Sequence, residues 1–387
     1  MSIDLDSAGS ITRTLEFLDA KPYSSRNTEN TGLQMFRSSA NNRQAIIVAS
    51  NPDPKKSAIG VRECELIQEA LDHASNTRIP LIFLWSTPGA RISEAAIGLG
   101  AIARVLQQTL KSREFPIISV VLGSTAGIGA YLTTLGEFSF FVKGAQLFMT
   151  GPKVVEELAG VSEAKEQIGG YATHMQSGIP TEMCENISHL EESMNTILDL
   201  LQNANSKKEF VYKKYLGQAI KIRLSRISER LCGNIEISQG LGDPSVSDIK
   251  KLNMFLRTSS ALRLPLVTFI DTRGMKPGSR EEANGALLQG AELMRLLHSY
   301  PAFRLAIIDG GSIAAVHLAL GSLGSSADYV LATADADIHV MTKDARMVFS
   351  DSTTTTPREL LAAGIISEVV VEPELTMRIE SVLRERA

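Results

Sequence analysis

The sequence has 387 residues, which is enough chain for two domains with separate buried cores. Its 39 Lys and Arg residues against 43 Asp and Glu residues give a net charge of −4, which argues against a non-specific nucleic-acid binder because such a protein needs a basic surface. Cys64, Cys184 and Cys232 lie too far apart for a disulfide scaffold or a four-thiolate zinc site. We find no signal peptide and no apolar run of membrane-spanning length, so we expect a cytoplasmic protein without a membrane partner.

Short apolar runs alternate with helical patterns through the first half of the chain. Residues 1–43 are polar and form a predicted N-terminal segment, with loops at 24–32 and 38–43. The apolar runs predict strands at 45–50, 80–86, 116–123 and 138–144, and helical spacing predicts helices at 64–74 and 94–110. The runs at 80–86 and 116–123 are apolar throughout, which is typical of parallel strands buried on both faces.

Two different patterns follow in the middle of the chain. Ile187, Leu190, Met194, Ile197 and Leu201 recur at spacings of three and four, which predicts an amphipathic helix. The basic stretch 206–226 is interpreted as the solvated face of a helix, with contact to a phosphate-bearing ligand as the alternative.

The order of elements repeats about 185 residues later. The strand and turn PLIFLWSTPG at 80–89 correspond to PLVTFIDTRG at 265–274. Each copy continues with a helix rich in small residues and a second strand, and that strand ends in STAGIGA in the first copy and in GGSIAAV in the second. A duplicated β–loop–helix–β–loop–helix unit explains this order. We therefore predict two α/β domains, residues 44–205 and residues 206–387.

The sequence offers no obvious acid–base or metal chemistry. Its six histidines form no pair at metal-ligand spacing, and it has neither a GxSxG nucleophile motif nor a phosphate-binding GxxxxGK[ST] loop. The remaining candidates are the turns TPGAR at 87–91 and TAGIGA at 125–130, where a buried strand passes into a helix. Such turns expose backbone N–H groups that suit a developing oxyanion, for example on a thioester. Tight packing without function is the alternative interpretation.

Four ordered segments carry a family resemblance. They are TPGARISEAAIGLGAIARVL, GSTAGIGAYLTTLGEFSFFVKGAQLFMTGPKVVEELAG, GGYATHMQSG and DTRGMKPGSREEANGALLQGAEL. In this order they resemble carboxyltransferases of the crotonase-like superfamily, in particular the β subunits of propionyl-CoA and other acyl-CoA carboxylases. Parts of the same segments are also similar to the malonate decarboxylase β and γ subunits: ISEAAIGLGAIARVL and GPKVVEELAG to the former, DTRG with GSREE to the latter.

The resemblance implies a fold and an assembly. The fold is α/β, with two tandem crotonase-like (ClpP/crotonase) ββα-superhelix domains, the N-terminal one for the acyl-CoA and the C-terminal one for carboxybiotin. The active site lies between the N domain of one protomer and the C domain of another, which implies a homo-oligomer, either a dimer or a trimer of dimers. No biotinylation motif is present, so the biotin carrier protein and the biotin carboxylase are separate chains. An acyl carrier protein is the alternative thioester carrier.

The resemblance also implies the site residues. One oxyanion hole falls at Gly89 and Ala90 with Gly127 and Ile128, and a second at Gly274 and Met275 with Ala314 and Ala315. Further residues for substrate binding are Arg91, Thr125, Ala126, Gly151, His174 and Ser177. For Arg91 the alternative is a loop-anchoring ion pair, and for His174 and Ser177 it is the ordering of a loop. Asp271 is interpreted as a cap of the turn that follows it.

The chain departs from the family pattern in its loops. The usual SGGAR is TPGAR at 87–91, the usual DTPG is DTRG at 271–274, and the usual Gly-Gly pair of the biotin-side loop is Ala314-Ala315. A methyl group at each alanine disfavours a positive φ. This difference favours a second candidate function beside the carboxyltransferase, a biotin-independent decarboxylase of a malonyl thioester. A third candidate is a catalytically silent scaffold subunit.

Overall fold

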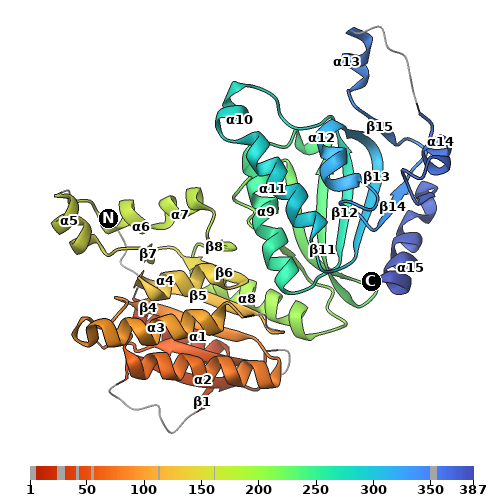
Figure 1. Ribbon diagram of the computed structural model, residues 1–387. Helices are drawn as coiled ribbons and strands as arrows, with labels where there is room; N and C mark the ends of the chain where they lie inside the picture. The colour runs from red at the N-terminus through yellow and green to blue at the C-terminus, as the bar shows by residue number, and fades with distance from the viewer. Residues whose placement is uncertain are drawn as a thin grey trace. The chain divides into compact units, whose positions relative to one another are not determined.

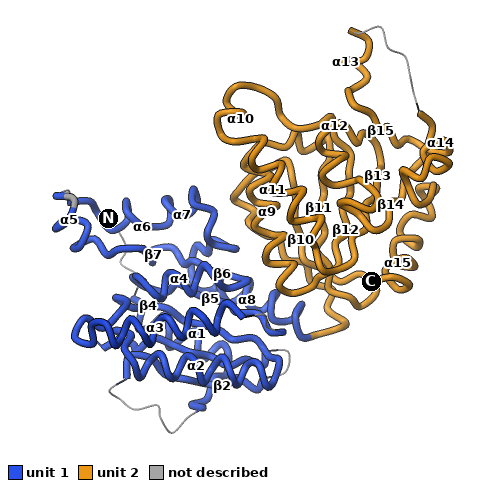
Figure 2. The backbone as a smooth tube through the Cα atoms, viewed as in Figure 1, with its two compact units in different colours: residues 1–202 blue, residues 203–387 orange. Residues whose placement is uncertain are grey.

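The chain folds into two compact units, residues 1–202 and residues 203–387 (Figure 2). The structure is a computed structural model that describes residues 6–23, 31–40, 43–53, 56–111, 114–160, 162–348 and 355–387. The sequence analysis placed the boundary between the domains after residue 205, close to the division after residue 202. In the described part of the chain, every helix is too short or too polar to span a lipid bilayer.

Unit 1 is built on a mixed sheet (Figure 1). The described strands run in the order β1-β2-β3-β4-β5-β6-β8, with β7 beside β5. The first two pairs are antiparallel and all later pairs are parallel. The strands are β1 Ala20–Pro22, β2 Leu33–Ser38, β3 Ala45–Ser50, β4 Leu81–Thr87, β5 Ile117–Ala126, β6 Phe138–Val142, β7 Gln146–Phe148 and β8 Glu182–Cys184.

The helices of unit 1 cover this sheet. They are α1 Ser7–Phe17, α2 Val61–Thr77, η1 Ile92–Glu94, α3 Ala95–Thr109, α4 Ile128–Leu135, α5 Pro152–Ala159, α6 Lys165–Gly169, α7 Tyr171–Ser177 and α8 Ile187–Gln202. Helices α2 and α3 bury their apolar faces, through Ile67, Ala70 and Val105, against β4 side chains such as Phe83 and Trp85. All seven residues of β4 are buried, as expected for a central parallel strand.

Unit 2 repeats the plan. Its described strands run in the order β16-β14-β13-β12-β11-β10-β9, with β15 beside β13. The strands are β9 Glu209–Val211, β10 Ile220–Ile227, β11 Arg230–Ser238, β12 Leu266–Thr272, β13 Arg304–Ile313, β14 Tyr329–Ala332, β15 Asp337–His339 and β16 Glu368–Val369. The helices are η2 Gln239–Leu241, α9 Val246–Ala261, α10 Ser279–Ala283, α11 Ala286–His298, α12 Ala314–Val316, the π-helix η3 His317–Gly321, α13 Lys343–Val348, α14 Pro357–Ala362, η4 Glu372–Glu374 and α15 Leu375–Arg386.

Two stretches differ from the sequence-based prediction. The described residues of the polar segment 1–43 include α1, β1 and β2, so this segment is part of unit 1. Most of the loop predicted at 24–32 lies outside the described residues. The basic stretch 206–226 forms β9 and most of β10, so the helical interpretation was wrong. Ile220, Ile222 and Leu224 are buried at a spacing of two, a strand period that the basic residues between them obscure.

The internal duplication extends to the register of the strands. In unit 1, Thr87 of β4 pairs with Thr125 of β5, after an irregularity in the ladder. In unit 2, Thr272 of β12 pairs with Ser312 of β13, after an irregularity at the same place. Because parallel strands end at the same edge of a sheet, each unit brings two strand-to-helix turns together there. These two edges are where the sequence predicted the candidate sites.

Candidate active site

The first pair of turns follows β4 and β5. Gly89 has φ +95° and Gly127 has φ +59°, conformations that favour glycine. A Cβ atom on Gly89 would lie 3.0 Å from the Ala126 carbonyl oxygen and 3.6 Å from the Gly127 Cα. The two turns therefore touch through backbone atoms, and the structure brings Gly89, Ala90, Gly127 and Ile128 together.

Internal hydrogen bonds occupy some N–H groups of this site and leave others open. Gly89 N–H donates to Thr87 Oγ1 at 3.1 Å, and Gly127 N–H donates to the Phe148 carbonyl at 3.2 Å. No described residue accepts a hydrogen bond from the N–H of Ala90 or of Ile128. These two donors are the ones that the first site can offer to a ligand oxygen.

The direction of the Ala90 N–H is fixed by a neighbouring segment. Ile59 N–H donates to the Gly89 carbonyl at 2.8 Å, and Arg91 N–H donates to the Ile59 carbonyl at 2.8 Å. This is a parallel bridge between Ile59 and Ala90. In such a bridge the flanking peptide groups bond to the partner strand, so the N–H of Ala90 itself points away from Ile59.

The second pair of turns, in unit 2, has the same hydrogen bonds. Gly274, at φ +114°, donates its N–H to Thr272 Oγ1 at 3.2 Å. Lys276 N–H donates to the Pro244 carbonyl at 2.9 Å, as Arg91 N–H does to Ile59. Ala314 follows β13 as Gly127 follows β5. The counterparts of the Ala90 and Ile128 N–H groups are thus those of Met275 and Ala315.

Ala314 keeps the backbone conformation of a glycine. Its φ is +50°, close to the +59° of Gly127. The sequence analysis expected the alanine to disfavour this conformation. For an L-residue the left-handed region costs about 1–2 kcal/mol, so the surrounding fold imposes the turn on Ala314. The second loop is also more open, because no described atom lies within 4 Å of a Cβ on Gly274.

His174 and Ser177 lie under the first pair of turns. His174 Nε2 contacts the Leu147 carbonyl at 2.8 Å, and its Nδ1 lies 3.0 Å from Ser177 Oγ. A carbonyl only accepts, so we assign the proton to Nε2. Burial lowers the pKa of His174, and the hydrogen bond to Leu147 opposes this in part. The pair holds β7, whose Phe148 carbonyl in turn accepts the Gly127 N–H.

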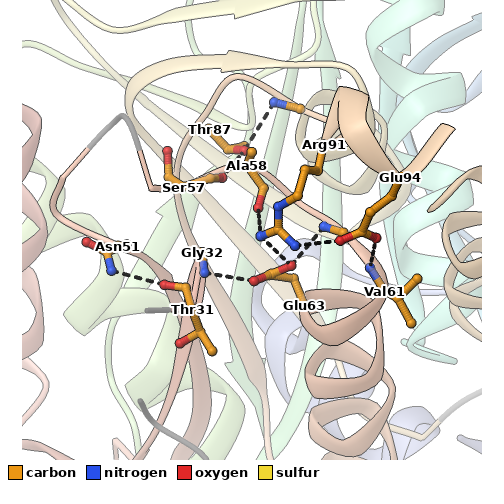
Figure 3. A network of polar contacts seen from close by, with 12 residues as sticks. Thr31, Gly32, Asn51, Ser57, Ala58, Val61, Glu63, Thr87, Arg91 and Glu94 are labelled. Carbon is orange, nitrogen blue, oxygen red and sulfur yellow. Dashed lines mark hydrogen bonds and ion pairs between the residues drawn. The ribbon is translucent and has the colours of Figure 1, made fainter. Parts of the chain in front are cut away.

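The other predicted substrate-binding residues differ in their exposure. Thr125 is fully buried at the end of β5, and Ala126 lies beneath Gly89. Gly151 is the N-cap of α5, with open space around the position of a Cβ atom. Arg91 points into unit 1 toward Glu63 and Glu94 (Figure 3). The sequence analysis overlooked both glutamates, although a Glu three residues after Gly60 is a helix N-terminus signal.

A cavity of about 360 Å³ adjoins the first loop. Hydroxyl side chains and one ammonium group line much of it, namely Ser7, Ser57, Ser86, Thr87, Ser124 and Lys165. The cavity offers polar groups to a ligand beside Pro88 of the loop. Sequence spacing gave no signal for it because the residues come from six separate segments.

Two polar contacts support the second pair of turns. Asp271 Oδ1 accepts from Gly311 N–H at 3.0 Å and from Gln239 Nε2 at 2.7 Å. Asp271 therefore bonds across to β13, and no described residue of the turn that it was expected to cap donates a hydrogen bond to it. His317 Nδ1 lies 3.0 Å from Ser312 Oγ, and burial lowers the pKa of His317. Among the described residues, no three His, Cys, Asp or Glu side chains gather to hold a metal ion.

Comparisons with known proteins show the family of this chain. A family profile described as the carboxyl transferase domain matches residues 39–215 and 224–359. The methylmalonyl-CoA decarboxylase subunit alpha of Propionigenium modestum is 26% identical over 334 residues, which cover 73% of this chain and 64% of that protein. The biotin-dependent acetyl-/propionyl-coenzyme A carboxylase beta6 subunit of Mycobacterium bovis is 23% identical over 356 residues, 81% of this chain and 75% of that protein. The chain spans 64–65% of the length of the first curated relatives that it matches.

A solved structure matches both units. Transcarboxylase 12S with methylmalonyl-coenzyme A and methylmalonic acid bound has a TM-score of 0.85 at 19% identity, covering 98% of this chain and 90% of that chain. A likeness at this identity shows the fold. It confirms the α/β architecture of two tandem crotonase-like domains that the sequence predicted.

Proposed function

The chain belongs to the carboxyl transferase domain family, and from that membership we propose that it moves a carboxyl group between carboxybiotin and an acyl-CoA. One observation carries the proposal: each unit presents two backbone N–H groups that donate to no described residue, at the ends of neighbouring strands and in the same register. Paired N–H donors stabilise an oxygen that gains negative charge in the transition state.

Unit 1 supplies the acyl-CoA side in this proposal. The N–H groups of Ala90 and Ile128 hold the thioester oxygen, which becomes negative when a carboxylated acyl-CoA loses CO2 from its α-carbon and the bonding electrons move to that oxygen. The Ile128 N–H also lies at the N-terminus of α4, where the helix dipole favours a negative charge. No side-chain nucleophile is needed, in keeping with His174, whose two ring nitrogens already contact the Leu147 carbonyl and Ser177 Oγ.

Unit 2 supplies the carboxybiotin side. Its two open donors, the N–H groups of Met275 and Ala315, suit a single carbonyl oxygen, and the ureido ring of biotin carries one. When bound, carboxybiotin supplies the carboxyl group that is transferred. This chain's residues hold and orient that ring, and the open space beside Gly274 leaves room for it.

We propose a homo-oligomer in which unit 1 of one copy works with unit 2 of another. Large apolar side chains stand exposed beside both loops, including Ile92 at 93% and Ile97 at 76% exposed in unit 1, and Leu287 at 81% in unit 2. Exposed apolar patches of this kind mark protein contacts. Size-exclusion chromatography with light scattering tests this, and an active monomer of 41.9 kDa contradicts it.

The biotin carrier protein and the biotin carboxylase are proposed as separate chains, with an acyl carrier protein as the alternative carrier of the thioester. A cytoplasmic location is also part of the proposal. Cys64, Cys184 and Cys232 are buried and none of them forms a disulfide bond, which suits a reducing compartment.

Assays of the purified chain with free biotin test the function. We expect malonyl-CoA or methylmalonyl-CoA to release CO2 faster when biotin is added. Release that ignores biotin supports the second candidate, a biotin-independent thioester decarboxylase, which the alanines at 314 and 315 favour. No turnover of any acyl-CoA, with or without biotin and its carrier, points to the scaffold subunit.

A proline substitution tests the backbone donor directly. Ile128 is the first residue of α4, where proline is well tolerated, so Ile128→Pro removes the N–H with little cost to the helix. Ile128→Ala is the matched control, because it loses the same side-chain contacts and keeps the N–H. We expect Ile128→Pro to lower turnover about 10²–10³-fold below Ile128→Ala. Equal turnover of the two variants contradicts the assignment.

A further inference from the structure

An ion-pair cluster lies behind the first loop (Figure 3). The Arg91 guanidinium is 2.9 Å from Glu63 Oε2 and 2.7 Å from Glu94 Oε1. Its Nη2 also donates to the Ala58 carbonyl at 3.0 Å. The Glu63 side chain is only 1% exposed, and those of Arg91 and Glu94 are 28% and 25% exposed. Arg91, the residue that follows Ala90 in the chain, thus carries a positive charge that two carboxylates hold in place.

Both carboxylates are fixed from their other side. Glu63 Oε1 accepts from Gly32 N–H at 2.8 Å, and its Oε2 accepts from Gly60 N–H at 2.8 Å. Glu94 Oε2 accepts from Val61 N–H at 2.6 Å. The cluster therefore joins the loop to the N-terminus of α2 and to the residue before β2.

The cluster keeps its charges near neutral pH. Burial alone raises the pKa of Glu63, but hydrogen bonds from Arg91 and from two N–H groups outweigh it, so that this pKa lies below its usual value. The hydrogen bond from Val61 N–H, with that from Arg91, lowers the pKa of Glu94. The hydrogen bond to Glu63 raises the pKa of Arg91.

The same contacts hold the segment that sets the direction of the Ala90 N–H. Ile59 bonds to the peptide groups on both sides of Ala90. Its neighbour Ala58 is bonded to Arg91, and its other neighbour Gly60 is bonded to Glu63. Movement of Ile59, and with it rotation of the Ala90 peptide group, requires these bonds to break.

Unit 2 provides an internal comparison, because a lysine replaces the arginine at this position and the ion pair of its loop is a different one, between Arg273 and Asp243 at 3.3 Å. Lys276 occupies the position of Arg91, and its N–H makes the corresponding bond to Pro244. Asp248, the counterpart of Glu63, accepts from Ala219, Ile220 and Ser245. Among the described residues Lys276 forms no ion pair. The backbone hydrogen bond to the neighbouring segment thus forms in unit 2 without an arginine at the position of Arg91, so variants of Arg91 are expected to fold.

We propose that Arg91 is a positioning residue, which with Glu63 and Glu94 fixes the Ala90 N–H on the thioester oxygen. This rests on the proposed function of the first site. Arg91 acts through the loop and does not contact the substrate. The guanidinium matters because its planar group reaches both carboxylates and a carbonyl at once, which an ammonium group does not reproduce.

Steady-state kinetics separate this role from substrate binding. With methylmalonyl-CoA and free biotin as probes, Arg91→Lys and Glu94→Gln are expected to lower kcat about 10–100-fold and to leave KM within about twofold, because a donor misplaced by 1 Å loses transition-state stabilisation. Arg78→Gln, which breaks the exposed Arg78–Glu114 pair, is the control and keeps wild-type kinetics. A raised KM with little change in kcat means that Arg91 binds the substrate, and it overturns the proposal, as do wild-type kinetics of Arg91→Lys.

Hydrogen exchange followed by mass spectrometry tests the cluster without any substrate. The amides of residues 57–63 and 88–95 are expected to exchange at least about tenfold faster in Arg91→Gln than in wild type, and unchanged in Arg78→Gln. Unchanged exchange in Arg91→Gln overturns the proposal. A wild-type chain without turnover of either probe refutes the proposed function instead, and the exchange comparison then still decides whether Arg91 orders the loop.

Discussion

Replacing Ala314 with glycine is expected to stabilise unit 2. Ala314 is exposed and has φ +50°, which costs an L-residue about 1–2 kcal/mol. Glycine removes this strain but adds about 0.4–1 kcal/mol of conformational freedom to the unfolded chain. The difference leaves a gain of about 0–1.6 kcal/mol in the free energy of unfolding, and its midpoint of about 0.8 kcal/mol corresponds to roughly 2–3 °C in Tm.

Two further variants test whether the positive φ at residue 314 is the cause of this change in stability. Gly127→Ala places an alanine at a similar positive φ, +59°, in unit 1. The nearest described atom to the new Cβ is the Gly89 Cα at 3.8 Å, so strain and not collision sets its cost. We expect it to lose about 1–3 kcal/mol, because φ +59° with ψ −121° is a conformation that L-residues rarely adopt. Ala315→Gly is the neighbouring control without a positive φ, and it loses about 0.5–1 kcal/mol as glycine does in a helix.

Urea denaturation with two probes measures these changes. Trp85, the only tryptophan, lies in β4, so its fluorescence reports unit 1, whereas far-UV circular dichroism reports both units. Ala314→Gly is expected to move the transition seen by circular dichroism to higher urea without a change in m-value. If Ala314→Gly lowers stability as much as Ala315→Gly does, the strain at residue 314 is not real and the reasoning fails.

Three other substitutions follow from contacts described above. Gly89→Ala places a methyl group 3.0 Å from the Ala126 carbonyl at φ +95°, so we expect a loss of about 1–3 kcal/mol in urea denaturation together with loss of turnover. Burial lowers the pKa of His174 below 6.5, so the unfolded chain binds the proton more tightly than the folded chain. The free energy of unfolding is therefore expected to fall as the pH drops through 6.5. His174→Gln is expected to flatten this part of a curve of Tm against pH, and an unchanged slope contradicts the prediction. Asp328 accepts three hydrogen bonds from the largely buried Arg304, so Asp328→Asn is expected to cost about 2 kcal/mol in thermal unfolding, whereas no loss means that the pair adds nothing.

The sequence predicted the strands that form the two edges because their apolar runs are continuous. The run at 45–50 coincides with β3, and those at 80–86 and 116–123 lie within one to three residues of β4 and β5. The loops could also be located, since Gly89 and Gly274 stand at the same place in two copies of one pattern. The turn at each glycine lies beside the turn that follows the neighbouring strand. The order of the segments in the sequence indicates this proximity only if the two strands are parallel.

The contacts behind the loops could not be predicted. Glu63 is 28 residues before Arg91, and only the packing of α2 beside the loop places its carboxylate against the guanidinium. Ala314 misled the sequence analysis for a related reason, because a local preference of about 1–2 kcal/mol is smaller than what the surrounding fold can impose. Local propensities gave the elements, whereas long-range packing decided the side-chain partners.

The buried cysteines offer a way to measure how often each unit opens. Cys64 lies in α2 of unit 1 and Cys232 in β11 of unit 2, and burial raises the pKa of each thiol to about 11. A thiol reagent attacks the thiolate, so labelling in the native protein has to wait until the surrounding unit opens. The labelling rates of Cys64 and Cys232, read from separate peptides, therefore measure how often each half of the duplication opens independently of the other.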